Sequence, residues 1–145
     1  MEKIKLTVKN VISLYKTADP LEICEKMGII ILEQDLPDNV NGFMLNYLDL
    51  RFIIINCNRY GYEKRVTVAH ELGHIILHST TNSIRLNCNT SFCVSKYERE
   101  ADYFAAYLLM ELEMSSLDGF ESVTTQDISK IIHMPQSVVD KVFSE

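Results

Sequence analysis

The sequence lacks the features that mark several large classes of protein. No hydrophobic run reaches the length of a membrane-spanning helix, and the opening Met-Glu-Lys-Ile-Lys-Leu alternates charged and apolar side chains, unlike a signal peptide. Internal repeats and low-complexity segments are absent, and 47% of the 145 residues are hydrophobic. We therefore expect a cytoplasmic, ordered protein that forms one domain over residues 1–145.

Basic residues are also scarce. The chain has 14 Lys and Arg against 20 Asp and Glu, which gives a net charge of −6. An acidic surface repels phosphates, so direct binding to nucleic acid is not expected. Acidic residues gather after residue 97, where they either attract a basic protein partner or simply solvate helix faces.

The four cysteines do not form a recognisable framework. Cys88 and Cys93 are separated by four residues, where a zinc knuckle typically has two, and no histidine pair accompanies them. In a reducing cytoplasm we expect these two, together with Cys24 and Cys57, to remain thiols.

The most informative feature that is present is His70-Glu71-Leu72-Gly73-His74, a HExxH motif. Histidines at this spacing project from one face of an α-helix, about 6 Å apart along its axis, so both can bind one metal ion. Glu71 is placed to act as a general base without being a ligand. The flanking valines, isoleucines and leucines predict a buried helix, in which two histidines and a glutamate would be costly without a metal.

A third histidine in the same helix, His78, cannot complete this site. It lies about 12 Å from His70 along a straight helix, too far for both to bind one ion with bonds of about 2 Å. We expect His78 to pack, or to form a hydrogen bond near the C-terminal end of the helix.

The candidate for the third ligand is Glu98, in a second predicted helix. Asp102 is four residues further on, so both carboxylates share a face, and Asp102 can accept a hydrogen bond from the outer ring nitrogen of a ligating histidine. Two alternatives stay open. Ser95 and Glu98 also have the spacing of a capping box, and Asp102 can equally be a solvated surface charge.

Two segments together resemble the ImmA/IrrE family of small metallopeptidases. These are Ala-His-Glu-Leu-Gly-His-x-x-Leu-His and, downstream, Glu-x-Glu-Ala-Asp-x-Phe-Ala-Ala-x-Leu-Leu-Met. The resemblance implies a gluzincin-like site, with His70, His74 and Glu98 as metal ligands and Glu71 as the base. It also implies a regulatory role, since family members are often encoded by prophages or integrative elements and lead to cleavage of helix-turn-helix repressors.

One position departs from this family. The second motif commonly ends in proline, whereas Glu111 follows Met110 in this sequence. Because a proline would end the helix, its absence lets the helix run on towards Ser115.

The expected fold is α+β: a small zincin-like domain with a short antiparallel sheet packed on the HExxH helix and on a second ligand-bearing helix. Residues 29–33 predict a buried strand, and residues 42–47 and 50–56 predict a hairpin. The connection from 79 to 94 is expected to form a cleft wall or lid, with a short strand near Leu86. The parts in order are N-terminal helices over 1–28, the sheet over 29–56, the metal-binding helices and their connection over 61–112, and a helical cap over 118–145.

Local signals mark several of these helices. Asp19-Pro20 is a strong helix start, Gly28 a stop, and Thr124 to Asp127 a capping box in front of the last two short helices. Those two helices imitate a DNA-binding pair, but their segment is acidic, so we read them as a cap on the catalytic core.

The expected function is that of a zinc-dependent endopeptidase that cuts a helix-turn-helix repressor at a specific site. The same donors also suit Mn²⁺ or Fe²⁺. The alternative is a metal-stabilised binding module that sequesters a repressor without cutting it, since structural and catalytic metal sites share ligands.

Overall fold

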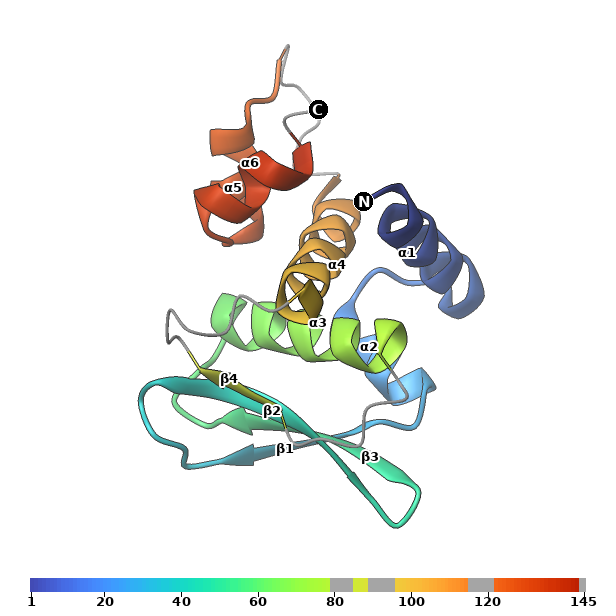
Figure 1. Ribbon diagram of the computed structural model, residues 1–145, viewed down its shortest axis with the longest axis vertical. Helices are drawn as coiled ribbons and strands as arrows, with labels where there is room; N and C mark the ends of the chain where they lie inside the picture. The colour runs from blue at the N-terminus through green and yellow to red at the C-terminus, as the bar shows by residue number, and fades with distance from the viewer. Residues whose placement is uncertain (79–84, 89–95, 115–121, 144–145) are drawn as a thin grey trace.

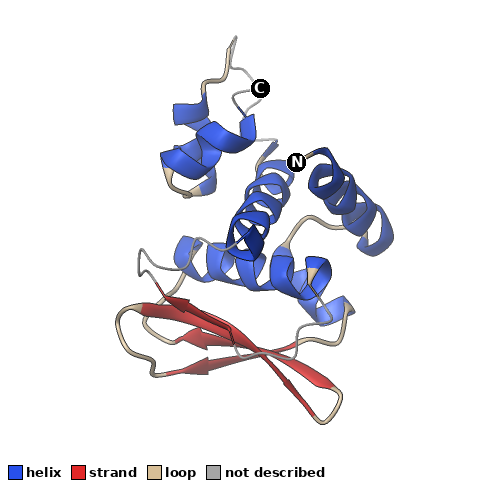
Figure 2. Cartoon of the chain, viewed as in Figure 1, coloured by secondary structure: helices blue, strands red, loops and turns tan. Residues whose placement is uncertain are grey.

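The computed structural model describes residues 1–78, 85–88, 96–114 and 122–143. Across these ranges a sheet forms one layer, and α3 (Tyr62–Leu77) lies across one of its faces (Figure 1). Helix α4 (Lys96–Leu112) packs on α3, and the remaining helices lie on the same side of the sheet (Figure 2). The α+β zincin-like fold class is thereby confirmed.

Within the described ranges the sheet has four strands in the order β1-β3-β2-β4. Strands β2 and β3 form the predicted hairpin, in which Leu48 and Asp49 adopt φ angles of 47° and 62° and so make the tight turn. The strands are β1 (Ile30–Gln34), β2 (Val40–Tyr47), β3 (Leu50–Asn56) and β4 (Arg85–Cys88).

The expectation of an antiparallel sheet is wrong for one pair of strands. Strand β1 runs parallel to β3, whereas β2 is antiparallel to both β3 and β4. The chain reverses direction between β1 and β2 and again in the hairpin, so β3 runs in the direction of β1, and it lies beside β1 in the sheet. The sheet is therefore mixed.

Strand β1 also differs from the buried strand that its apolar run predicted. It lies at the edge of the sheet, and Ile30 and Leu32 are 36% and 40% exposed. Only alternate side chains of a strand face one layer, and here Ile31 is the β1 residue that packs against the helical core. Three consecutive isoleucine and leucine residues thus mark an edge strand here.

The hydrophobic core lies between the sheet and α3 and continues between α3 and α4. Strand β2 contributes Met44 and β3 contributes Ile53 and Ile55, which cluster with Leu72 of α3 and Phe104 of α4. Helix α3 also approaches β2 closely, because a Cβ added at Gly42 would lie 2.9 Å from Thr67 Cγ2 of α3. Helix α3, which carries the HExxH motif, therefore packs tightly against the sheet.

The N-terminal helices form as their local signals predicted. Helix α1 spans Glu2–Tyr15, and α2 spans Pro20–Lys26 after an Asp19 cap whose side chain accepts a hydrogen bond from Leu21 N at 2.8 Å. Gly28 follows with φ 71°, the left-handed conformation that ends a helix. No helix in the described ranges is long and apolar enough to cross a membrane.

The C-terminal helices, α5 (Thr125–Ile132) and α6 (Gln136–Phe143), contact α4. The predicted capping box is confirmed: Thr124 Oγ1 accepts from Asp127 N, and Asp127 accepts from Thr124 N. Helix α4 ends at Leu112, two residues past Met110, and so stops short of Ser115, which lies outside the described residues. The division into four parts of one domain stays a prediction.

Two other expectations are tested only in part. The connection between α3 and α4 does contain a short strand, β4, but its flanks at 79–84 and 89–95 lie outside the described residues, as does any lid they would form. Cys24 and Cys57 are free thiols, and burial raises the pKa of Cys24 to about 12. The side chain of Cys88 and all of Cys93 lie outside the described part.

Candidate metal centre

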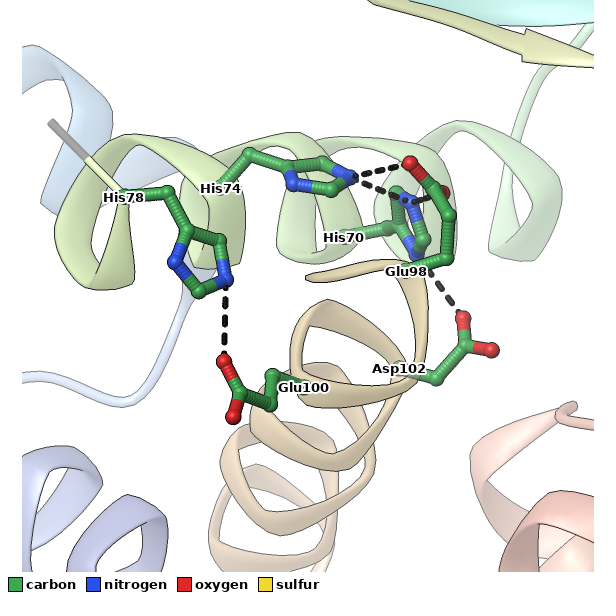
Figure 3. Close-up of polar contacts among 6 residues, drawn as sticks. All are labelled: His70, His74, His78, Glu98, Glu100 and Asp102. Carbon is green, nitrogen blue, oxygen red and sulfur yellow. Dashed lines mark hydrogen bonds and ion pairs between the residues drawn. The ribbon is translucent and has the colours of Figure 1, made fainter. Parts of the chain in front are cut away.

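Three side chains from the two motif helices converge on one point (Figure 3). His70 Nε2 lies 3.1 Å from His74 Nε2 and 3.2 Å from Glu98 Oε2, and His74 Nε2 lies 3.3 Å from Glu98 Oε1. All three offer one donor atom within 4.8 Å of the others. Two imidazoles and a carboxylate at this separation are a donor set for a single divalent metal ion.

The convergence depends on the close packing of α3 against α4. A Cβ added at Gly73 would lie 3.2 Å from Ala101 Cα, from Ala101 O and from Phe104 Cβ. Only glycine lets the two backbones approach this closely without displacement. The approach brings the first turn of α4, which carries Glu98, over the histidine pair of α3.

Asp102 lies one turn beyond Glu98 and contacts the other side of the His70 ring. Its Oδ1 lies 2.8 Å from His70 Nδ1. Because an ionised carboxylate is only an acceptor, His70 donates to it through Nδ1–H, and in the neutral ring the Nε2 lone pair is then directed at the point of convergence. This is the tautomer that a metal ion requires.

The electrostatics of the three side chains favour a cation between them. Burial lowers the pKa of His70, but hydrogen bonds to Asp102 and Glu98 and the nearby charge of Glu71 outweigh it and raise that pKa to about 10. Burial likewise opposes ionisation of Glu98, yet the hydrogen bonds from His70 and His74 hold its pKa well below the usual range. In the metal-free protein a proton on His70 therefore supplies the positive charge that a divalent metal ion would supply at the same position.

Glu71 adjoins this site on α3 and is fully buried, with 0% of its surface exposed. It does not belong to the group of three convergent donors, yet its charge acts on the neighbouring His70. Its position thus differs from that of Glu98, which is one of the three convergent residues.

His78 lies outside the three convergent donors, as the helical spacing predicted. Its Nε2 lies 3.4 Å from Glu100 Oε2, and its ring meets Tyr97 edge-on at a centroid distance of 4.6 Å. Glu100 was not among the residues that the sequence singled out, although its place in the second motif was the available signal. The capping alternative for Glu98 depends on Ser95, which lies outside the described residues and so stays open.

Comparisons with known proteins agree with the two motifs. Residues 24–139 match the family Peptidase_M78, described as the IrrE N-terminal-like domain. The uncharacterized immunity region protein 2 of Bacillus phage phi105 is 36% identical over 132 residues, which cover 91% of this chain and 84% of that protein. The metallopeptidase ImmA of Bacillus subtilis strain 168 is 29% identical over 145 residues, which cover 98% and 85%. No solved structure matches.

The matched family extends over most of the chain, and both relatives align along most of their length. The convergent histidines and glutamate offer a donor set that suits a divalent metal ion. The chain therefore belongs to the IrrE N-terminal-like family, Peptidase_M78, and is a metallopeptidase.

Proposed function

We propose that this protein is a zinc-dependent endopeptidase in which His70, His74 and Glu98 bind the metal ion and Glu71 is the general base. The observation that carries the proposal is the convergence of two Nε2 atoms and one carboxylate, with Asp102 holding His70 in the metal-binding tautomer. Three protein ligands leave one coordination position open, which is typical of catalytic zinc sites.

Each residue then has a distinct task. Lewis acidity, which acidifies water and polarises a carbonyl, is what a zinc ion supplies when bound. Glu71 takes a proton from the attacking water and delivers it to the leaving amine. Asp102 keeps the His70 ring oriented through the 2.8 Å hydrogen bond.

Zinc is proposed over Mn²⁺ and Fe²⁺ because two imidazoles and one carboxylate are a common catalytic zinc set, although the other two ions accept the same donors. Metal analysis of protein purified without added metal distinguishes the three. About one zinc per chain is expected, and about one manganese or iron would replace zinc in the proposal.

We further propose that the substrate is a helix-turn-helix repressor in the cytoplasm. The phage relative is named an immunity region protein, which supports a role in repressor control. The net charge of −6 also favours a basic partner, such as a protein that binds DNA.

The test is cleavage of the helix-turn-helix regulator encoded beside this gene. Wild type, Glu71→Gln and chelator-treated protein are compared, with metal content measured in each. Metal-dependent cutting by wild type alone is the expected result. Equal binding by wild type and Glu71→Gln without cutting would contradict the proposal and favour the non-proteolytic binding module.

A further inference from the structure

A cavity of about 550 Å³ lies beside the first two turns of α3. Its α3 wall is formed by Tyr62, Glu63, Val66 and Thr67. Residues three and four apart share a helix face, so Val66 and Thr67 lie on the same face of α3 as His70. Val66 and His70 are about 6 Å apart along the helix axis. We call this cavity the α3 pocket.

A guanidinium is fixed at the side of the α3 pocket. Arg59 Nε donates to Asn41 Oδ1 at 2.9 Å, and Arg59 Nη2 donates to Asp38 O at 2.6 Å. These bonds use two of the five N–H groups of the side chain and hold it in one orientation. The pocket therefore presents a preorganised donor with positive charge.

An acceptor lines the same cavity. Glu63 is exposed, and no ion pair joins it to Arg59 among the residues that the structure describes. An acidic ligand is thus attracted by Arg59 and repelled by Glu63. A basic ligand is attracted by Glu63 and repelled by Arg59. An uncharged carboxamide can satisfy both, because its oxygen accepts from the guanidinium and its nitrogen donates to the carboxylate.

One residue from the C-terminal part of the chain, His133, also lines the pocket. His133, which caps α5 with φ 55°, stacks on Tyr62 at a centroid distance of 3.5 Å and an interplanar angle of 22°. This stack and Val66 supply an apolar surface for the stem of a ligand side chain. A volume of about 550 Å³ exceeds one side chain, so adjoining backbone also fits.

We propose that the α3 pocket is a substrate subsite that selects a residue with a carboxamide side chain, asparagine or glutamine, beside the cleaved bond. This inference rests on the proposed function, because it takes the ligand to be a peptide that reaches the metal centre. It gives the C-terminal end of α5, through His133, a role in substrate selection.

The test measures peptide binding separately from cleavage. Immobilised Glu71→Gln protein, loaded with zinc, is exposed to dodecamer peptides with randomised central residues, and the retained peptides are sequenced. Asparagine and glutamine should be enriched about tenfold at one position, the scale of one hydrogen bond to a charged group. Adding Arg59→Gln should shift the preference to lysine and arginine, and adding Glu63→Gln should shift it to aspartate and glutamate.

Matched controls neutralise charges outside the pocket. Arg51→Gln and Glu25→Gln change exposed residues of β3 and α2 and should leave the preference as it is. His133→Ala removes part of the apolar wall from an exposed turn, and should reduce the enrichment without changing the preferred charge. Thermal unfolding of each variant identifies any that fail to fold.

The outcomes separate the two proposals. No enrichment, or the same preference after both charge changes, overturns the α3 pocket as a carboxamide subsite. Wild-type protein is exposed to the same library in solution. If it cuts nothing while the Glu71→Gln protein shows the expected preferences, the peptidase proposal fails and the pocket stands.

Discussion

The two halves of α3 are built for different tasks. Tyr62 and Glu63, near its start, are exposed and line an open pocket. His70, Glu71 and His74 are 5%, 0% and 1% exposed and are covered by α4. One helix thus combines a solvent-accessible wall near its start with a buried donor group about two turns further on. Under the two proposals above, substitutions can therefore alter binding and chemistry separately.

The two histidines within the buried half differ as well. His70 Nδ1 is held by Asp102, whereas His74 Nδ1 has no hydrogen-bond partner among the described residues. The orientation of the His70 ring therefore depends on α4 through two contacts, Asp102 and Glu98. This asymmetry predicts which substitutions disturb the site most.

Removing a metal ligand should have the largest effect. His70→Ala is expected to abolish metal binding and all hydrolysis, because two remaining donors do not hold a catalytic ion. Metal content after dialysis is the measurement, and His78→Ala, which changes a histidine outside the convergent group, is the control. Unaltered metal content in His70→Ala would refute its assignment as a ligand.

Removing the support of His70 should have a smaller effect. Asp102→Ala is expected to weaken metal binding about 10- to 100-fold, because the ring loses the partner that fixes its tautomer. Asp102→Asn keeps an acceptor oxygen and should lose less. Competition with a chromophoric chelator measures both affinities, and equal affinity in Asp102→Ala and wild type would show that Asp102 is only a surface charge.

Separating α3 from α4 should disturb the site indirectly. Gly73→Ala forces a Cβ to within 3.2 Å of Ala101 and Phe104, and overpacking of this kind lowers the free energy of unfolding by about 1–3 kcal/mol. Metal affinity should fall several-fold, since Glu98 moves with α4. Gly61→Ala is the control: its φ of 57° makes alanine strained, but no atom lies within 4 Å of the added Cβ, so metal affinity should not change. Equal metal affinity in Gly73→Ala and wild type would refute the role of this contact.

The smallest expected effect is the release of about one proton when the protein binds a metal ion. The pKa of His70 is raised from 6.5 to about 10 in the metal-free protein, so at pH 7 a metal ion must displace about one proton. Calorimetry in buffers of different ionisation enthalpy should detect this release. If metal binding at pH 7 releases no proton, His70 is already neutral and the cause given for its raised pKa is wrong.

The raised pKa of His70 also makes the stability of the metal-free protein depend on pH, and in the opposite direction to its metal affinity. A raised pKa contributes stability that is fully present below pH 6.5 and is lost as the pH rises through about 10. Chelator-treated protein should therefore become less stable over this range, while its affinity for metal increases. Thermal unfolding across the range measures the first change, and a constant melting temperature would contradict it.

Local signals in the sequence predicted much of this structure. The Asp19 cap, the Gly28 stop and the Thr124 capping box each involve neighbours within three residues, so their outcome does not depend on the fold. The His70 and His74 pair follows from helical geometry alone. The parallel pairing of β1 depends on where β3 inserts, which no local pattern encodes.

The contacts between the two motif helices, and those of the α3 pocket, could not be predicted from the spacing of residues in the sequence. Glu98 meets the histidines where α4 packs closely on α3 at Gly73, a contact between residues far apart in sequence. Two other features have the same non-local origin. One is the contact of His78 with Glu100, and the other is the α3 pocket, in which His133 stacks on Tyr62. Periodicity places a residue on a face of its own helix, but the packing of elements decides what that face meets.

The most direct test of the metal centre is anomalous diffraction at the zinc edge from crystals of the protein grown with zinc. One ion bound by His70 Nε2, His74 Nε2 and Glu98, with Glu71 outside its first coordination sphere, is the result we predict. An ion bound elsewhere, or one that is coordinated by Glu71 in place of Glu98, would contradict the account.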